Sequence, residues 1–463
     1  MSAKGNRALA LLVAGTFFME NLDATVITPA IPAMAQSFGV APVDLSAGIS
    51  AYMLTLGVFI PVSGWIAERF GARRVFAAAI LVFTLASVLC GLATGLGSFI
   101  AARILQGIGG AMMVPVGRLV VLRQTPKDQL VQAIAVLTWP ALVAPVLGPP
   151  LGGLMVEHGD WRWIFWLNLP LGALALIAAL RLVPQTTAER GKSFDWPGFL
   201  LTGAAVFCLM LVAEMLSRPD MQLAIAGSTL SLGLILLACG VRHLNHAANP
   251  MLRLSALKIP TFAVTIWGGS LFRMGVSAVP FLLPVMFQIG FGYSAFQAGM
   301  MLMAVFAGNL VMKPATTAVM RRFGFRRVLL VNGTLNALLI AACASFAAAM
   351  PLWLICAILF LGGMTRSMQF TALNSIAFAD VPKEGMSDAN TLFSTAFQLA
   401  MGLGVALGAI AWRIGTKFSQ GADPAVPFRI AFLIVAAIAI CSLLDCLRLA
   451  SNAGDRVARP QTS

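Results

Sequence analysis

A short basic segment occurs twice in this chain, each time between two long apolar stretches. Seven residues recur at a constant separation of 253 positions, so that Pro61, Arg69, Phe70, Gly71, Arg73, Arg74 and Val75 return as Pro314, Arg322, Phe323, Gly324, Arg326, Arg327 and Val328. This spacing predicts a chain built from two related halves. Two related helical halves around a central site, exposed to each side of a membrane in turn, are typical of secondary transporters.

The composition is that of a membrane protein. Hydrophobic residues make up 59% of the 463 positions and charged residues only 10%, against roughly 25% charged residues in an ordinary soluble domain. The net charge of +14 would suggest nucleic acid in a soluble chain. Here Lys and Arg gather in alternate loops, as membrane topology requires. Because no basic patch is interleaved with aromatic residues, we expect no nucleic-acid partner.

The sequence lacks the motifs of disulfide formation, metal binding and enzyme catalysis. The seven cysteines have no disulfide or zinc spacing and are expected to be small packing residues. His243 and His246 are three apart but lack a third ligand, so we expect no metal. The sequence contains no nucleotide-binding loop, metalloprotease motif or serine-nucleophile elbow. We therefore expect neither an enzyme with catalytic residues nor a cofactor.

Fourteen apolar segments follow when the chain is divided into spans of about 20 residues. They lie near 8–32, 45–69, 75–95, 98–122, 129–156, 162–183, 196–216, 221–243, 260–289, 294–320, 327–349, 352–378, 386–414 and 427–447. The first contains Glu20 and Asp23 and lacks a cleavage site, which indicates a retained helix and not a signal peptide. An even number of spans puts both termini on one side. The loops on that side carry most of the Lys and Arg residues, so we expect both termini to be cytoplasmic.

The repeat pairs the second segment with the tenth. The predicted fold is therefore an all-α membrane protein of two pseudo-symmetric six-helix bundles, helices 1–6 and 9–14, with helices 7 and 8 as an inserted hairpin. We expect the first bundle over 1–183, linkers and inserted helices over 184–258, the second bundle over 259–449 and a cytoplasmic tail over 450–463.

Three ordered motifs resemble those of the major facilitator superfamily. Residues 64–74, GWIAERFGARR, resemble the signature loop between helices 2 and 3, where acidic and basic residues latch the cytoplasmic side of the bundle. Glu68 stands where that family usually has Asp. Residues 103–110, RILQGIGG, resemble the helix 4 motif that the family associates with proton coupling. Residues 148–153, GPPLGG, resemble the antiporter motif of exporters.

Two further patterns, at residues 22–32 and 161–170, are similar to those of the fourteen-helix drug:proton antiporter branch. The resemblance covers essentially the whole chain and, within that branch, is strongest to a group of multidrug transporters. It implies a proton-coupled antiporter that exports small organic molecules or drugs across the bacterial inner membrane. The expected partners are a small-molecule substrate, protons and membrane lipid, and the expected state is a monomer.

The residues expected to form the gate and the conformational motifs come from these segments. They are Gly64, Glu68, Arg69, Gly71, Arg73, Arg74, Gly148, Pro149, Gly152, Gly153, Arg322, Gly324, Arg326 and Arg327. The physical alternatives are plain. Membrane orientation alone would explain the basic loops, and ordinary close packing of a membrane helix would explain the Gly and Pro run.

Ionisable residues inside the first half carry the strongest functional argument, because each costs at least ~2.5 kcal/mol at the centre of a membrane helix. At a rise of ~1.5 Å per residue, Asp23 and Arg103 reach similar depth, so they can pair. A carboxylate that exchanges its Arg partner for a proton would couple proton entry to substrate exit; the alternative is a permanent structural ion pair. Glu20 shares a helix face with Asp23 and is the candidate for a second proton carrier or a contact to a cationic substrate. Its alternative is a carboxylate that faces a wet cavity without a specific task.

The second half carries positive charge inside its spans. Arg273, Lys313 and Arg366 lie in helices 9, 10 and 12, and no acidic residue of that half is comparably deep. With Gln369 they are the predicted substrate-cavity residues, and they would favour an anionic or zwitterionic substrate. Otherwise Lys313 reaches the interface, the arginines bond to backbone carbonyls and Gln369 holds helices together. Export of a narrow class of anionic metabolites or siderophores is therefore the alternative function, and a membrane sensor that transports nothing is a remoter one.

Overall fold

The computed structural model describes residues 3–40, 42–126, 129–185, 193–217, 222–293, 295–419, 424–450 and 453–454. Within these ranges the regular structure is entirely helical. Thirteen helices in the described residues are long and apolar enough to span a membrane. The remaining predicted segment, 129–156, is the 29-residue helix α7 (Leu130–His158). The chain is a multi-pass membrane protein.

The first bundle contains the helices from α1 to α9. Their bounds are α1 (Ala3–Val26), α2 (Ile31–Phe38), α3 (Ser46–Phe59), α4 (Ser63–Phe70), α5 (Ala72–Gly91), α6 (Leu96–Gln124), α7, α8 (Trp163–Trp166) and α9 (Asn168–Leu182). The second predicted span is divided between α3 and α4 by a short 3-10 turn, Ile60–Val62. Pro61 lies in that turn, where its missing N–H removes one bond of the helical ladder.

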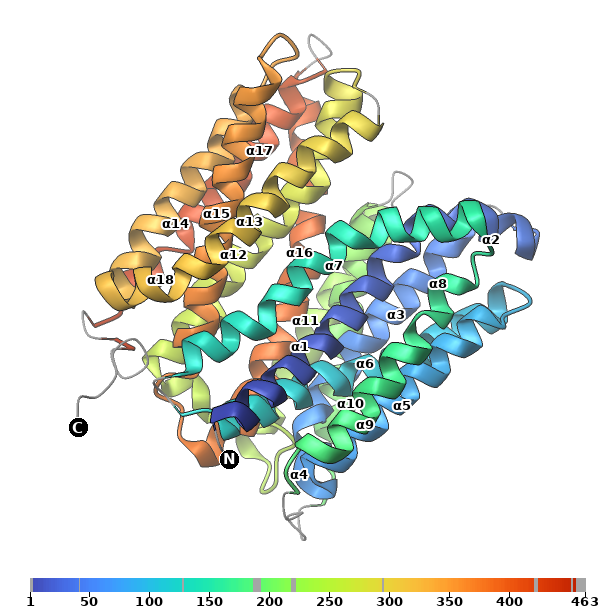
Figure 1. The fold of residues 1–463 in the computed structure, drawn as a ribbon. Coiled ribbons are helices and arrows are strands. Elements are labelled where there is room, and N and C mark those ends of the chain that lie inside the picture. The colour runs from blue at the N-terminus through green and yellow to red at the C-terminus, as the bar shows by residue number, and fades with distance from the viewer. Residues whose placement is uncertain are drawn as a thin grey trace.

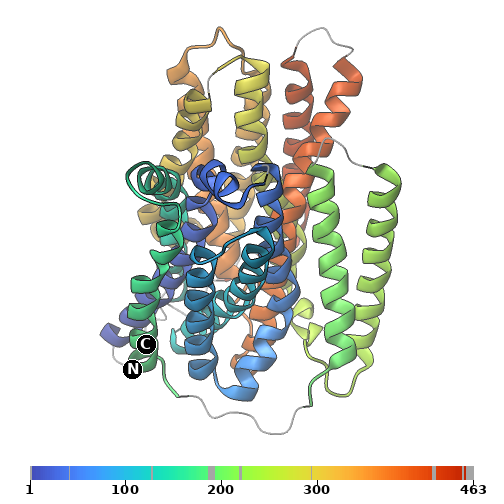
Figure 2. The ribbon, with the colours of Figure 1, turned by 90° about the vertical axis from the view of Figure 1, so that its right-hand side faces the viewer.

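The inserted hairpin and the second bundle follow. The hairpin is α10 (Trp196–Ser217) and α11 (Leu223–His246), and the second bundle is α12 (Pro260–Val285), α13 (Ala295–Phe323), α14 (Phe325–Ala342), α15 (Leu352–Ile376), α16 (Met386–Ser419), α17 (Val426–Cys441) and α18 (Leu444–Leu447). A π-helical turn, Met286–Gly290, extends α12. Figure 1 shows the two bundles as separate groups of helices, and Figure 2 shows the hairpin along one side of the molecule.

The two bundles repeat the same helix packing. Helix α1 packs on α7 as α12 packs on α16, and α5 packs on α6 and α9 as α14 packs on α15 and α17. The hairpin packs through α10 against α3 of the first bundle and α16 of the second. These contacts give the two pseudo-symmetric bundles with an inserted hairpin that the repeat predicted.

Glycines let the paired helices approach closely. A methyl group on Gly148 or Gly152 of α7 would clash with Thr25 or with the backbone oxygen of Val26 in α1. In the second bundle, a methyl group on Gly404 of α16 would clash with the side chain of Ser277 in α12. Small residues at such positions allow backbones to touch. The same contact is therefore built twice, once in each bundle.

The repeated basic segments form the same turn in each half. Gly71 between α4 and α5 has φ 84°, and Gly324 between α13 and α14 has φ 74°. Residues with a Cβ rarely adopt these values, which explains why the repeat needs glycine there. Both turns, the start of α1 and the end of α18 lie at one end of the molecule (Figure 1). We call this the terminal end.

At the base of the hairpin, one carboxylate connects the linker that precedes α10 with the linker that follows α11. Asp195 accepts hydrogen bonds from the N–H groups of Gly198 (2.9 Å) and Met251 (3.1 Å) and from Nε2 of His243 (2.7 Å). Burial works to raise its pKa, but these hydrogen bonds outweigh burial, so the pKa of Asp195 lies below its ordinary value. His243 thus has a carboxylate partner. Residues 186–192 of this linker and most of the predicted tail 450–463 lie outside the described residues.

Candidate functional site

A buried ion pair lies in the first bundle. Nη1 of Arg103 in α6 is 2.7 Å from Oδ2 of Asp23 in α1, and neither side chain is exposed to solvent. The two residues that the depth argument paired are in direct contact. An ion pair without solvent is costly unless further hydrogen bonds satisfy both groups, so the surroundings of the pair decide how it behaves.

Polar side chains from two helices complete the surroundings of Asp23. Its Oδ1 accepts hydrogen bonds from Nε2 of Gln106 (2.9 Å) and Nδ2 of Asn168 (2.8 Å). Arg103 Nη1 also donates to Oε1 of Gln106 (2.6 Å), and its guanidinium lies 4.3 Å from the centre of the Tyr52 ring. Asp23 is therefore a carboxylate that accepts hydrogen bonds from three donors.

The sequence predicted Asp23 and Arg103 as site residues but not the other two members of this network, Gln106 and Asn168. Gln106 and Asn168 both lie inside the motifs quoted above, in RILQGIGG and in residues 161–170. A polar side chain inside an apolar motif was the signal that could have found them.

Glu20 faces a cavity between the two bundles. This central cavity has a volume of about 450 Å³ and is lined from α1, α3, α10 and α16, by Glu20, Asn21, Tyr52, Met210, Phe397 and Gln398 among others. Glu20 is half-buried, and its Oε2 has no hydrogen-bond partner among the described residues. The cavity is large enough for a small organic molecule and carries one acidic group on the wall of the first bundle.

Arg118 is a functional candidate that sequence reasoning missed. Its guanidinium lies 5.7 Å from the ring centre of Phe17 in its own bundle and 5.1 Å from that of Phe393 in α16. Nη1 is 3.5 Å from Oγ of Ser394, also in α16, and Glu20 is the acidic group whose charge acts on it. Arg118 therefore links the charge of Glu20 to the contact between the bundles. An arginine inside an apolar span, which is the signal that pointed to Arg103, marks it as well.

The bundles meet near the terminal end, and they diverge toward the other end (Figure 1). Gly64 in α4 packs against Thr391 and Ser387 of α16. Nδ2 of Asn390 donates to the backbone oxygen of Pro115 in α6 (2.8 Å). These contacts join the two bundles near the terminal end.

The basic residues of the repeated turns make equivalent contacts. Arg73 at the start of α5 donates to the carbonyl oxygen of Leu180 near the end of α9, and Arg326 at the start of α14 donates to that of Leu447 at the end of α18 (3.2 Å). Cations at helix C-termini stabilise the last carbonyl groups.

The other predicted gate residues lie around these contacts. Glu68 Oε1 is 3.5 Å from Nη2 of Arg123 in α6. The guanidiniums of Arg322 and Arg327 lie 5.5 and 5.9 Å from the Phe323 ring, while Arg69 is half-buried and Arg74 exposed. Gly153 has open space around it, and the side chain of Pro149 lies outside the described part of the chain.

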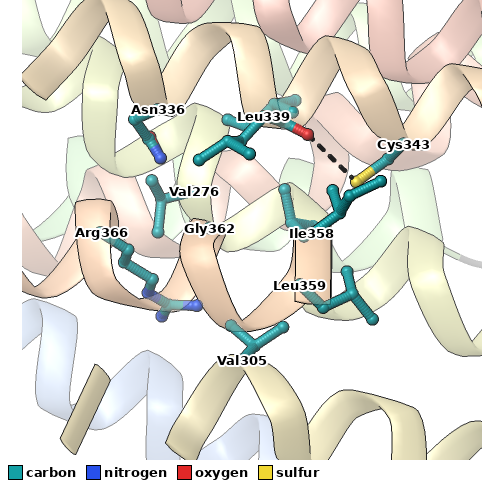
Figure 3. Close-up of a pocket in the computed structure, with 11 residues that line it drawn as sticks. Val276, Val305, Asn336, Leu339, Cys343, Ile358, Leu359, Gly362 and Arg366 are labelled. Carbon is teal, nitrogen blue, oxygen red and sulfur yellow. Dashed lines mark hydrogen bonds between the residues drawn. The ribbon is translucent and has the colours of Figure 1, made fainter. Parts of the chain in front are cut away.

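The predicted substrate-side residues of the second bundle do not meet in one cavity. Lys313 Nζ donates to Oγ1 of Thr371 (2.9 Å). Across the α14–α15 contact, Nε2 of Gln369 donates to Leu329 O (3.1 Å), and Oε1 of Gln369 accepts from Nδ2 of Asn332 (2.9 Å). Arg366 lines a small apolar cavity of about 30 Å³ with Asn336 and Val276 (Figure 3). None of these three residues lines the central cavity.

Arg273 lies closer to the central cavity but is covered. It is fully buried, and it donates to the backbone oxygen of Thr265 (2.9 Å) and to Oδ1 of Asn374 (3.3 Å). Its guanidinium lies 5.2 Å from the ring centre of Phe397, a residue that lines the cavity. Phe397 therefore contacts both the cavity and this cation.

Comparison with known proteins gives a consistent result. A family model described as Major Facilitator Superfamily matches residues 13–405. Proteins named "Putative multidrug resistance protein MdtD" from Pectobacterium carotovorum and from Klebsiella pneumoniae strain 342 are each 38% identical, and the matches cover 86% of this chain and 85% and 84% of those proteins.

Solved structures share the fold at low sequence identity. The human organic anion transporter MFSD10 (TETRAN) matches with a TM-score of 0.68 and 14% identity over 95% of this chain and 99% of that one. The proton:xylose symporter XylE bound to 6-bromo-6-deoxy-D-glucose matches with a TM-score of 0.65 and 13% identity over 98% of each. The likeness to these two concerns the fold alone.

Proposed function

Since the chain belongs to the major facilitator superfamily, we propose that it is a proton-coupled antiporter that exports small organic molecules or drugs across the bacterial inner membrane. The relatives named as multidrug resistance proteins support export of drugs. The observation that carries the proposal is the buried Asp23–Arg103 pair (2.7 Å) next to a cavity that contains a second acidic group.

In this mechanism Asp23 is the proton carrier. While it is ionised, it holds Arg103, Gln106 and Asn168 together and so fixes α1 against α6 and α9. A proton on Asp23 removes the charge that binds Arg103 and weakens all three hydrogen bonds. The helices of the first bundle can then rearrange, and the cavity changes the side to which it opens.

Glu20 is the auxiliary acid of this scheme. It is one turn away from Asp23 on α1 and lines the cavity, so a cationic substrate or a proton can reach it. Arg118 responds to its charge from the contact with α16.

The orientation and the division of the chain are part of the proposal. The basic loops at the terminal end support a cytoplasmic location for both termini. The proposed boundaries are 1–183, 184–258, 259–449 and 450–463. The molecule acts as a monomer in lipid, without nucleic acid and without enzyme activity. The Gly, Glu and Arg residues of the repeated turns, together with Pro149, act as the gate.

A flux assay in proteoliposomes tests the proposal. With an imposed pH gradient, the wild-type protein should move the cationic dye ethidium against its gradient, and Asp23→Asn should abolish this movement. Asp160→Asn is the matched control, because Asp160 forms an exposed pair with Arg162. Equal gradient-driven flux in Asp23→Asn and wild type would rule out Asp23 as the carrier.

The same assay separates the alternatives. Movement of citrate and not of ethidium, with the same requirement for Asp23, would favour an exporter of anionic metabolites or siderophores. If neither probe moves while the protein is folded and inserted, the non-transporting sensor becomes the better explanation.

A further inference from the structure

The central cavity has a carboxylate on one wall, and a residue of another wall contacts a buried guanidinium. Glu20 of α1 lines it with an Oε2 atom that has no partner among the described residues. Phe397 of α16 lines it from the second bundle, and the guanidinium of Arg273 lies 5.2 Å from the centre of that ring. The half-buried ring of Phe397 is thus the one cavity-lining side chain for which the described residues show a contact with Arg273.

The charge of Arg273 is not neutralised by any acidic group in the described part of the chain. Its two hydrogen bonds go to a backbone carbonyl and to the amide of Asn374, and its Nε is buried without a partner. Arg118, from the other bundle, acts on it with the same sign. A buried guanidinium without a counter-ion is strongly unfavourable, so an anionic group that reached it would be bound well.

Two aromatic rings contact the guanidinium of Arg273 in place of an anionic group. Phe393 and Phe397 present their rings to Arg273 at 4.9 and 5.2 Å, which is within the range of a cation–π contact. Neutral ring faces replace a counter-ion only in part. The ring of Phe397 therefore covers Arg273 without satisfying it.

The duplication places the two charges at corresponding positions. Glu20 and Arg273 are separated by the same 253 positions as the repeated turns, and they lie on the equivalent helices α1 and α12. The two halves thus contribute opposite charges from equivalent positions around one shared space.

We propose that Phe397 is a movable wall of the central cavity and that Arg273, once uncovered, binds the acidic group of a substrate whose basic group is bound by Glu20. The preferred substrates are zwitterionic organic molecules. This assignment rests on the proposed export function and specifies its substrate class.

A pair of dyes that differ in one carboxylate tests the proposal. Rhodamine B has a cationic ring system and a free carboxylate, and its ethyl ester has the same ring system without the acid. Fluorescence polarisation of the purified protein in detergent gives the affinity for each dye. Wild type should bind rhodamine B more tightly than the ester. Arg273→Gln should weaken binding of rhodamine B about tenfold, the loss typical of one charge-assisted hydrogen bond, and should leave binding of the ester unchanged.

Two further variants keep the test independent of folding. Arg273→Lys retains the charge and should retain the preference for rhodamine B. Phe397→Ala uncovers Arg273 and should increase the ratio of rhodamine B to ester affinity. Equal losses for both dyes in Arg273→Gln, or no loss for either, would overturn the proposal.

The outcomes distinguish this proposal from the proposed function. If wild type transports the ester with full dependence on the pH gradient but shows no preference for rhodamine B, export stands and the two-charge cavity is wrong. If wild type neither binds nor transports either dye, the export function fails and this inference fails with it.

Discussion

At the scale of single residues, Asp23 is the point where three helices of the first bundle meet. Donors from α6 and α9 converge on its two oxygens, and Asn168 extends the network to Oγ of Ser87 in α5 (2.9 Å). A carboxylate with so many donors cannot leave the network without leaving buried N–H groups unpaired. We therefore predict that protonation of Asp23 would change several helix contacts together.

Removing one donor should destabilise the first bundle. Asn168→Ala leaves Asp23 Oδ1 and Ser87 Oγ each without one hydrogen bond, which we expect to cost about 1–3 kcal/mol. Thermal unfolding in detergent measures the effect. Asn245→Ala is the control, because Asn245 is exposed on α11 and its replacement should change stability by less than about 0.5 kcal/mol. Equal melting temperatures for the two variants would contradict the role of Asn168.

Arg103 should not be replaceable by lysine. Its Nη1 serves both Asp23 and Gln106, and a lysine ammonium on a flexible stem lacks the fixed geometry of the guanidinium. We expect Arg103→Lys to reduce the initial rate of dye export at least about tenfold, the scale of one charge-assisted hydrogen bond. Full activity with normal expression would show that charge alone is enough at this position.

The sequence predicted how deep a side chain lies in the membrane better than it predicted which neighbour the side chain contacts. Counting residues along helices brought Asp23 and Arg103 to the same level, and they are in contact. Arg273, Lys313 and Arg366 were grouped by the same argument, but they point to different helix contacts. Spacing fixes how far along its helix a side chain lies, whereas the neighbour that it meets depends on helix rotation and packing, which a single sequence does not encode locally.

At the scale of helices, close glycine contacts join α1 to α7 and α12 to α16. The sequence located these helices well, because long apolar segments between basic loops are a strong signal. It did not locate the break at Ile60–Val62 or the π-helical turn at Met286–Gly290. Both are local adjustments next to Pro61 and Pro284, and proline within a membrane helix predicts a distortion without specifying its form.

Two alanine substitutions in one motif should differ sharply. A methyl group on Gly148 would clash with Thr25, whereas Gly153 has nothing within reach of one. Gly148→Ala should therefore destabilise the protein by about 1–3 kcal/mol through overpacking and slow transport, and Gly153→Ala should resemble wild type. Thermal unfolding and dye flux on the same preparations measure both effects. Similar behaviour of the two variants would mean that the α1–α7 contact is looser than described.

The hairpin should become less stable at acidic pH. Hydrogen bonds from Gly198, Met251 and His243 lower the pKa of Asp195, so its stabilising effect is present above the unfolded pKa of about 3.9 and is lost as the pH falls through the lower folded pKa. We expect the melting temperature of wild type to decrease below about pH 4. Asp195→Asn should be less stable at neutral pH and should lack this part of the pH dependence. If the melting temperatures of the two proteins changed with pH in parallel, Asp195 would not be the group that stabilises the base of the hairpin.

At the scale of the whole molecule, the bundles are joined near the terminal end and separate toward the other (Figure 1). The contacts of Gly64 with Thr391 and Ser387, and of Asn390 with Pro115, must break if the cavity is to open at the terminal end. Alternating access therefore predicts that a covalent link across these contacts stops transport.

A cross-link between α4 and α16 tests this prediction. Gly64→Cys with Ser387→Cys brings two thiols together in the described state, in a background where the exposed Cys239 and Cys441 are replaced by serine. Thr391→Ala is added to every protein of the series, because a Cβ on Gly64 would otherwise lie 2.4 Å from Oγ1 of Thr391. Oxidation should abolish dye flux, and a reductant should restore it, while each single cysteine variant should be unaffected by oxidant. Undiminished flux in the fully cross-linked protein would show that the terminal end need not open.

Proton movement driven by substrate tests the central claim most directly. Proteoliposomes that contain a pH-sensitive dye and no imposed gradient would receive ethidium from outside, and the internal pH would be recorded. The account predicts that uptake of ethidium by wild type drives protons out of the vesicles, that Asp23→Asn gives no pH change, and that Asp160→Asn behaves like wild type. Ethidium uptake without proton movement in wild type, or unchanged proton movement in Asp23→Asn, would contradict it.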